Sequence, residues 1–297
     1  MNLRYFIKNL TSNPRIFLNE FYTDFKKEIS FHNYESKNNL IWICGMPKSG
    51  TTLVERILDN LAYIRMDRSV LRVFPKKDLI NHNNLKDYIS CFPNNKYSYI
   101  KTHLKYDKNI VETLIKEKFK IIVTFRDLRD VMISRYFHVL SDKNHWQHDV
   151  VKSVSFEEGF IRSLSIITNK YPSPTPPGYT PVTSYYNWIR NWMHVNEKKN
   201  IKKIWYEDYI KDPNKFIKEI LDFTDFNNFD ELEIERKLDL KRKKEKNIPL
   251  IKKLKRSGRN VSTFRSGKIQ QWKDLFNDRI QREFDNLLPG KIEDILN

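Results

Sequence analysis

The sequence predicts an α/β protein in three layers, with a central, mainly parallel sheet flanked by helices. Apolar runs of strand length alternate along the chain with segments of helical periodicity, the pattern of strands joined by helical crossovers. Residues 119–125 (Phe-Lys-Ile-Ile-Val-Thr-Phe) are apolar and β-branched, as expected of a strand covered on both faces. A turn of small residues at 45–50 separates another apolar run from a helical pattern, so strand, loop and helix follow one another there.

Length and composition fit one large domain. The chain has 297 residues, of which 39% are hydrophobic, enough for a sizeable core. We expect a single domain over residues 1–297, with a core at about 38–275, an N-terminal helical lead-in at 1–37 and a C-terminal helical tail at 276–297. We expect no membrane span, because no apolar run reaches about 18–20 residues. We expect no secretory signal, because the apolar run near Met1 is too short.

Four strands are expected, each a short apolar or β-branched run ended by polar or small residues: Leu40–Cys44, Tyr97–Lys101, Phe119–Phe125 and Ile201–Tyr206. Helical periodicity and helix start signals predict the helices between and after them: Thr51–Leu61, fragments around Lys77–Ile89, Asn109–Lys118, Asp130–Leu140, Ser155–Thr168, Thr183–Asn196 and Pro213–Phe223. The Pro-rich stretch 171–181 cannot form a helix or an inner strand and predicts a loop.

The chain is strongly basic, with a net charge of +17. Nucleic acid, an acidic membrane surface or an anionic small molecule would each suit this charge, and a biased source genome would also enrich lysine. Residues 236–256 hold eleven Lys or Arg against two acids, and form either a solvated basic face or a wall around a polyanionic ligand. Two cysteines, Cys44 and Cys91, make no disulfide framework, so we expect a reducing, cytoplasmic setting.

The segment Gly45–Thr52 (Gly-Met-Pro-Lys-Ser-Gly-Thr-Thr) has the build of a phosphate-binding loop. Backbone N–H groups at a helix N-terminus, with the helix dipole behind them, hold anionic oxygens, so the expected fold is P-loop-like. The Walker A pattern of ATPases places Lys directly after the second Gly. Here Thr51 follows Gly50, and Lys48 lies inside the loop. The loop is therefore predicted to hold an activated phosphate-type donor that is not used as an ordinary nucleoside triphosphate.

A second segment, Arg126–Tyr136, follows the strongest predicted strand and opens a helix. Arg126 leaves the carboxyl end of that strand, where parallel sheets place their ligands. An arginine fork and the Ser134 hydroxyl can share one phosphate. The alternative is a surface ion pair between Arg126 and Asp127 or Asp130. Together with the first loop, the phosphate interpretation is favoured.

Four segments occur in one order along the chain: Pro47–Thr52, Arg126–Tyr136, Tyr206–Pro213 and Phe264–Lys273. Taken together they resemble the sulfotransferases that use 3′-phosphoadenosine 5′-phosphosulfate (PAPS). The similarity spans roughly residues 40–275. The resemblance implies that PAPS is the donor, that the desulfated bisphosphate PAP is the product, and that no metal is needed.

The resemblance also implies roles for named residues. The first loop is expected to hold the 5′ end of PAPS, with Lys48 beside the bridging oxygen, where negative charge grows as the bond breaks. Arg126 and Ser134 are expected to hold the 3′-phosphate, and Tyr206 to lie near the adenine. The complete set expected to bind the donor is Lys48, Ser49, Gly50, Thr51, Thr52, Arg126, Ser134, Tyr206, Arg265, Ser266 and Gly267.

The acceptor must lose a proton, and the segment Lys101-Thr-His103-Leu supplies a candidate base. It matches the place of the catalytic base in cytosolic-type sulfotransferases, so we expect His103 to take the proton and Lys101 to help neutralise the sulfuryl group. The loop also resembles the tyrosylprotein sulfotransferase branch, which uses a carboxylate base, and Asp67 is the alternative there. Glu55 is expected to make a surface or helix pair instead.

The chain departs from the family pattern around the donor. Leu53 stands where cytosolic-type members usually have an adenine-stacking Trp, so the source of that aromatic contact is open. Asp127 brings a negative charge near a phosphate site. The other changes are Leu128 in place of Pro, Ser266 in place of a Lys or Arg that Lys268 can replace, and Gln270-Gln271 in place of Gly-Asp.

The acceptor is predicted only by class, as a hydroxyl or amine of a small molecule or glycan. Its expected surroundings are rich in aromatic residues and histidine, which either pack in the core or line a pocket for an aromatic, sugar-like or cationic molecule: Tyr136, His138, Trp146, Tyr171, Tyr179, Tyr185, Tyr186 and Trp188. The oligomeric state is left open by the sequence.

Two other classes of protein share some of these features. A P-loop kinase or NTPase is the alternative, but the lysine after Gly50 is missing and no clear Walker B run is present. A nucleic-acid-binding protein would suit the charge, but no helix-turn-helix, zinc-finger or RNA-binding signature occurs. We therefore expect a nucleotide-binding transferase with no nucleic-acid partner.

Overall fold

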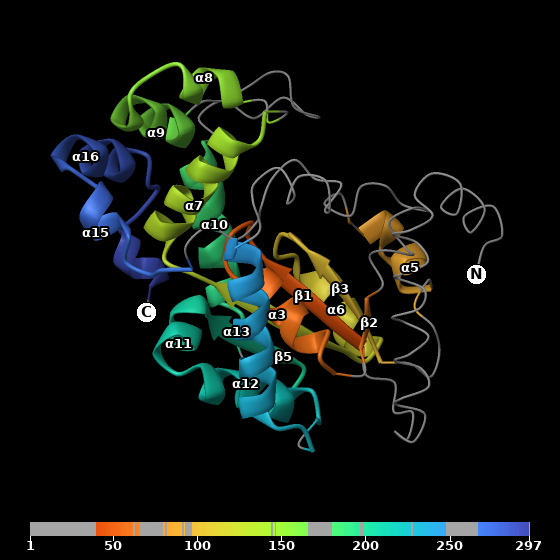
Figure 1. Cartoon of the computed structure of the whole chain (residues 1–297). Helices are drawn as coiled ribbons and strands as arrows, with labels where there is room; N and C mark the ends of the chain where they lie inside the picture. The colour runs from red at the N-terminus through yellow and green to blue at the C-terminus, as the bar shows by residue number, and fades with distance from the viewer. Residues whose placement is uncertain are drawn as a thin grey trace, which may run out of the picture.

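Five parallel strands form a sheet at the centre of the molecule (Figure 1). The computed structural model describes residues 40–61, 63–65, 80, 82–90, 92, 97–143, 145, 147–165, 180–196, 199–226, 228–247 and 267–296. The strand order is β2-β3-β1-β4-β5, with bounds β1 Leu40–Gly45, β2 Ile64–Arg65, β3 Ser98–Thr102, β4 Phe119–Phe125 and β5 Ile201–Trp205. The parallel α/β fold is confirmed. Strand β2 was not expected, because two residues are too few to make a pattern.

The helices follow the strands as crossovers and as an added C-terminal group. Their bounds are α3 Thr51–Leu58, α5 His82–Ser90, α6 Lys108–Lys116, α7 Leu128–Ser141, α8 His148–Lys152, α9 Phe156–Ser165, α10 Pro181–Met193, α11 Tyr206–Lys211, α12 Pro213–Phe223, α13 Glu231–Asn247, α15 Trp272–Leu275, α16 Asp278–Asn286 and the 3₁₀ helix Ile292–Ile295.

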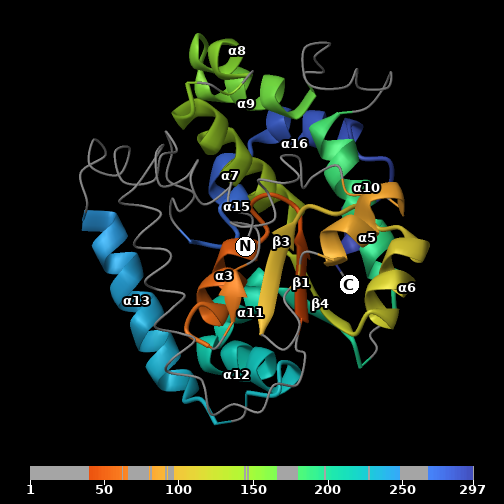
Figure 2. The same ribbon diagram turned by 90° about the vertical axis from the view of Figure 1, so that its right-hand side faces the viewer.

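Each face of the sheet has its own core. Along β1, Trp42 and Cys44 enter one apolar cluster, while Ile41 and Ile43 enter the other. The first cluster is completed by residues of α5 to α10, of α16 and of the 3₁₀ helix, and the second by residues of α3, α11, α12 and α13. Figure 2 shows β1 and β3 between α3 and α13 on one side and α5, α6 and α10 on the other. The three predicted layers are therefore present, because a strand alternates its side chains between two covered faces.

Several boundaries differ from the sequence prediction by a few residues, and two of these differences have clear local reasons. The strand expected over Ile201–Tyr206 ends at Trp205, and Tyr206 already begins α11. The helix expected from Thr183 begins at Pro181, because proline suits the first helical position and the Thr180 hydroxyl accepts a hydrogen bond from the Thr183 N–H at 3.1 Å. The single-domain organisation stays a prediction.

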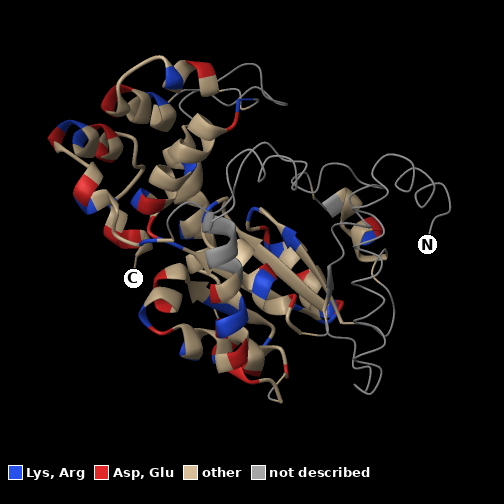
Figure 3. Cartoon of the chain, in the orientation of Figure 1, with Lys and Arg blue, Asp and Glu red and all other residues tan. Residues whose placement is uncertain are grey.

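Basic and acidic positions are interspersed over the described helices (Figure 3). On α16, for example, Arg279 pairs with Glu157 at 2.7 Å and with Glu158 at 3.0 Å. Part of the predicted basic stretch 236–256 continues α13 to Asn247, and its remainder lies outside the described residues. Among the residues described, no helix has the length and apolar character needed to cross a bilayer.

The carboxyl ends of four strands lie at one edge of the sheet. Register pairs Cys44 with Thr102, Gly45 with Thr124 and Phe125 with Trp205, so the segments that follow these strands start side by side. Those segments carry the side chains that the sequence singled out as functional: Lys48, His103, Arg126 and Tyr206. The fold therefore gathers four chain-distant motifs at the edge where parallel sheets bind ligands.

Candidate active site

The loop between β1 and α3 is held in shape by its own small residues. The Ser49 hydroxyl donates to the Met46 carbonyl at 2.8 Å and lies 2.8 Å from the Thr124 hydroxyl of β4. A Cβ on Gly45 would lie 2.0 Å from the same Thr124 oxygen, so only glycine fits there. Because the Ser49 side chain is engaged inside the protein, we assign it to shaping the loop.

The loop turns through left-handed backbone into the helix. Lys48 has a φ of 78° and Gly50 a φ of 104°. Gly50 is the N-cap of α3 and supplies no capping side chain. The first turn of α3 therefore begins at Thr51 and Thr52 with its N–H groups uncapped by a side chain, which is the arrangement that binds anions.

Positive charge is concentrated behind this loop. The pKa of Lys48 is lowered to about 8, first by burial and then by the neighbouring charges of Lys101 and Arg126. Lys101, on β3, forms an ion pair with Glu55 of α3. Glu55 is only 3% exposed, so the expectation that it pairs on the surface or along its own helix was wrong. The helix turns this carboxylate inward, onto the neighbouring strand.

Arg126 joins the loop to the C-terminal part of the chain. Its Nη1 donates to the Lys48 carbonyl at 3.3 Å and its Nη2 to the Lys268 carbonyl at 2.9 Å. The guanidinium carbon lies 4.8 Å from the centre of the Tyr206 ring, and the Tyr206 hydroxyl donates to the Gly267 carbonyl at 3.0 Å. Within the described part of the chain, the buried Arg126 Nε has no hydrogen-bond partner. A buried guanidinium with a donor to spare fits an anion.

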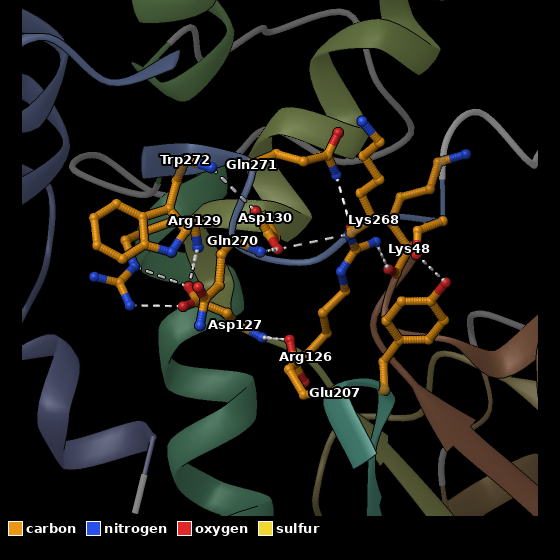
Figure 4. Close-up of polar contacts among 12 residues, drawn as sticks. Lys48, Arg126, Asp127, Arg129, Asp130, Glu207, Lys268, Gln270, Gln271 and Trp272 are labelled. Atoms are coloured by element: carbon orange, nitrogen blue, oxygen red, sulfur yellow. Dashed lines mark hydrogen bonds and ion pairs between the residues drawn. The ribbon is translucent and has the colours of Figure 1, made fainter. Parts of the chain in front are cut away.

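The predicted negative charge of Asp127 is balanced locally. Its carboxylate accepts hydrogen bonds from Arg129 Nε at 2.9 Å and Nη2 at 2.6 Å, and Arg129 lies over the Trp272 ring at 3.6 Å (Figure 4). The Asp127 N–H donates to Glu207 at 3.0 Å. Asp127 therefore organises the start of α7 as part of an ion pair. Sequence reasoning missed this use of Arg129 and Trp272.

His103 is held in place by the residues on either side of it. Thr102 accepts a hydrogen bond from the Trp42 indole at 2.8 Å. The Leu104 carbonyl accepts from the Trp188 indole at 2.8 Å and the Trp192 indole at 3.2 Å. His103 Nδ1 contacts the Gly45 carbonyl. Because a carbonyl only accepts, Nδ1 carries the proton and Nε2 carries the lone pair that a general base requires.

Two further predicted residues, Ser134 and His138, lie along α7. Ser134 is half-buried in its second turn, and His138 is one turn further on. Burial and the charge of Lys48 lower the pKa of His138 to about 4, so its imidazole is neutral at physiological pH. Among the described residues its buried Nδ1 has no hydrogen-bond partner. Of the aromatic residues predicted to surround the acceptor, Tyr136, Tyr186 and Trp188 belong to the core.

Leu53, which replaces the stacking tryptophan, and Tyr206 pack against the same apolar cluster. The Tyr206 ring also approaches the phosphate loop, since a Cβ on Gly50 would lie 3.1 Å from it. Tyr206 is thus the aromatic residue beside the loop in the described structure. Several predicted residues lie outside the described residues: Asp67, Trp146, Tyr171, Tyr179, Arg265 and Ser266.

No group of three or more His, Cys, Asp or Glu side chains able to hold a metal occurs among the described residues. His145 and His148 are engaged with the backbone, through the Gln147 N–H at 3.2 Å and the Val139 carbonyl at 3.1 Å.

Comparison with known proteins agrees with this geometry. The family model described as "Sulfotransferase domain" matches residues 38–295, which is most of the chain. The chain belongs to the sulfotransferase family. As a PAPS-dependent sulfotransferase, it transfers the sulfuryl group of PAPS and releases PAP.

Individual sulfotransferases are distant in sequence. Sulfotransferase 6B1 of Mus musculus is 23% identical over 256 residues, which cover 85% of this chain and 76% of the relative. The flavonol 3-sulfotransferase of Flaveria bidentis is 23% identical over 291 residues, which cover 89% of this chain and 85% of the relative.

Solved structures share the fold. Mouse sulfotransferase SULT7A1 complexed with PAP has a TM-score of 0.55 at 20% identity, over 87% of this chain and 86% of that one. Retinol dehydratase in a complex with retinol and PAP has a TM-score of 0.54 at 18% identity, over 92% and 86%.

Proposed function

We propose that this sulfotransferase sulfates a hydroxyl or amine of a small-molecule or glycan acceptor, with His103 as general base and Lys48, Lys101 and Arg126 as the cations that hold the donor. The observation that carries the proposal is the buried Arg126 Nε, which has no hydrogen-bond partner in the described structure and belongs to the side chain that contacts the Lys48 carbonyl. An anionic donor supplies the missing partner and is also attracted to the neighbouring Lys48.

The donor residues divide between its two ends. The first N–H groups of α3, with Thr51 and Thr52, bind the 5′ phosphosulfate, and Lys48 neutralises the bridging oxygen. Arg126, whose Nε has no partner in the described structure, binds the 3′-phosphate together with Ser134. Tyr206 contacts the adenine, while Arg265, Ser266 and Gly267 complete the 3′ side.

In the transfer step, His103 Nε2 accepts the proton of the acceptor hydroxyl as that oxygen forms its bond to sulfur. The bond between sulfur and the bridging oxygen breaks, and its electron pair stays on that oxygen as part of PAP. Lys48 stabilises the charge that appears there, and Lys101 stabilises the sulfuryl oxygens. The products are the sulfated acceptor, PAP and a proton, so the step needs no metal and no redox partner.

Within the proposed acceptor class, His138 supports a hydroxyl-bearing molecule. Its imidazole is neutral, interacts with Lys48 and can form a hydrogen bond with a hydroxyl. A screen of phenols, amines and oligosaccharides with labelled PAPS identifies the acceptor. We also propose a cytoplasmic location, where the buried thiol of Cys44 stays reduced, and subcellular fractionation checks it.

The donor assignment is tested by ligand-dependent thermal unfolding. PAP at about 100 times its Kd is expected to stabilise the protein by about 2.7 kcal/mol through mass action. ATP with Mg²⁺ at the same concentration is expected to give a much smaller shift, because the loop has no lysine after Gly50. A shift with ATP and none with PAP would overturn the proposal in favour of a P-loop kinase or NTPase.

A further inference from the structure

Asp130 holds the C-terminal chain against the start of α7. It is fully buried, and its carboxylate accepts hydrogen bonds from the Gln270 N–H at 2.6 Å and the Trp272 N–H at 3.3 Å (Figure 4). Arg126 Nη2 lies 3.8 Å from the same carboxylate. One side chain of α7 therefore contacts both the arginine and residues 267–272, which we name the C-terminal strap.

The strap contains a backbone conformation that its sequence disfavours. Gln270 has a φ of 56°, in the left-handed region where residues with a Cβ are strained. Glycine would adopt this conformation without strain. The N–H of this same residue donates the shorter of the two bonds to Asp130. The buried Asp130 carboxylate thus holds the strap at Gln270, where the strained backbone would otherwise leave the left-handed conformation.

The strap in turn holds Arg126. The Lys268 carbonyl accepts a hydrogen bond from Arg126 Nη2 at 2.9 Å and another from the Gln271 side chain at 2.9 Å. The Gly267 carbonyl accepts one from the Tyr206 hydroxyl at 3.0 Å. If residues 270–272 moved, the carbonyl that orients the guanidinium would move with them. A donor-site arginine is therefore oriented by a carboxylate that need not touch the donor.

We propose that Asp130 is a positioning residue for the donor's 3′-phosphate, acting by fixing the C-terminal strap so that Lys268 orients Arg126. This inference rests on the proposed assignment of Arg126 to that phosphate. The Arg129 side chain, stacked 3.6 Å from the Trp272 ring, provides a second hold on the same strap. The role is assigned to the 3′ end of the donor, because Arg126 is the residue proposed to bind that phosphate, whereas the start of α3 is proposed to bind the 5′ end.

The test compares Asp130→Asn with the wild type for two nucleotides, PAP and adenosine 5′-monophosphate, which lacks the 3′-phosphate. Asn offers one acceptor oxygen and places an NH₂ group against a backbone donor, so one strap bond is lost. Calorimetry is expected to show PAP affinity lower by roughly 10-fold and adenosine monophosphate affinity changed by less than about 3-fold. An equal loss for both nucleotides, or no loss for PAP, would overturn the proposal.

Rescue by glycine separates positioning from general damage. In the Asp130→Asn background, Gln270→Gly removes the strain that the carboxylate opposes, and is expected to restore most of the lost PAP affinity. Absence of rescue, with a folded protein, would contradict the role of the strap. Should Asp130→Asn fail to fold, Trp272→Leu loosens the strap from Arg129 and is expected to show the same selectivity for PAP, with equal losses again refuting it.

Two controls keep this inference apart from the proposed function. Asp149→Asn makes the same chemical change at an exposed position of α8 and is expected to leave both affinities unchanged. Arg126→Ala tests the phosphate assignment itself and is expected to weaken PAP more than Asp130→Asn does. If Arg126→Ala binds PAP normally, the assignment fails; if it weakens PAP while Asp130→Asn does not, only the positioning role fails.

Discussion

At the scale of single residues, one hydrogen bond decides which nitrogen of His103 can act as a base. The Gly45 carbonyl keeps the proton on Nδ1, and three indole groups fix Thr102 and Leu104 on either side. The sequence identified His103 through a short motif. The tautomer depends on a carbonyl 58 residues earlier in the chain, which only folding brings close.

Replacing His103 with Ala is expected to lower kcat by about 10²–10⁴-fold, the usual contribution of a general base, while PAP affinity stays nearly unchanged. His194→Ala, at an exposed position after α10, is the matched control and is expected to retain full activity. Steady-state kinetics and calorimetry measure both quantities. Turnover within about 10-fold of wild type would instead favour another base, such as Asp67.

The lowered pKa of Lys48 predicts that the protein takes up protons when it binds the donor. A pKa of about 8 in the free protein leaves Lys48 partly neutral at pH 8. A bound bisphosphate favours the charged form and raises that pKa, so PAP binding at pH 8 is expected to take up part of a proton. The measured enthalpy of PAP binding should then depend on the ionisation enthalpy of the buffer. In the variant Lys48→Arg this dependence should be absent. Near pH 6.5 Lys48 is already charged, so its contribution to the buffer dependence should vanish. Binding enthalpies that do not depend on the buffer at pH 8 would contradict the assignment of Lys48 to the donor site.

At the scale of elements, α3 and β3 are joined by two polar contacts whose spacings match. Glu55 contacts Lys101, and Asp59 accepts a hydrogen bond from the Tyr99 hydroxyl at 2.9 Å. Four residues of helix rise about 6 Å and two residues of strand about 6.6 Å, so both pairs meet at once. The helix behind the phosphate loop is thereby fastened to the strand that leads to His103.

Removing the charge of Glu55 is expected to affect both stability and catalysis through Lys101. Breaking a buried ion pair typically costs about 3–5 kcal/mol, and Glu55→Gln is expected near the lower end because the shape is kept. Glu55→Gln should lower kcat less in a Lys101→Met background than in the wild type, since the two residues act together. Denaturation curves and kinetics of the wild type, the two single variants and the double variant measure this. Additive losses would show that Glu55 acts independently of Lys101.

At the scale of the whole molecule, the strand order explains why motifs far apart in sequence make one site. β1 lies between β3 and β4, and β5 follows β4, so four carboxyl ends adjoin at one edge. The +17 charge is a property of the whole chain, whereas the site depends on where a few cations are held. Three acidic residues in the same network, Glu55, Asp127 and Asp130, lie against Lys101, Arg129 and Arg126 respectively.

The sequence alone determined the layered parallel fold, the sulfotransferase family and the segments that carry Lys48, His103 and Arg126. These follow from local patterns: apolar periodicity, small residues in a loop and short motifs. Two contacts became known only from the folded structure: the ion pair of Glu55 with Lys101 and the hydrogen bond from the Gln270 N–H to Asp130. Those contacts join residues 46 and 140 positions apart, and the sequence around each partner carries no signal of the other. The order of the strands and the rotation of each helix about its axis determine which buried charges come into contact. Both are fixed only when the sheet is assembled.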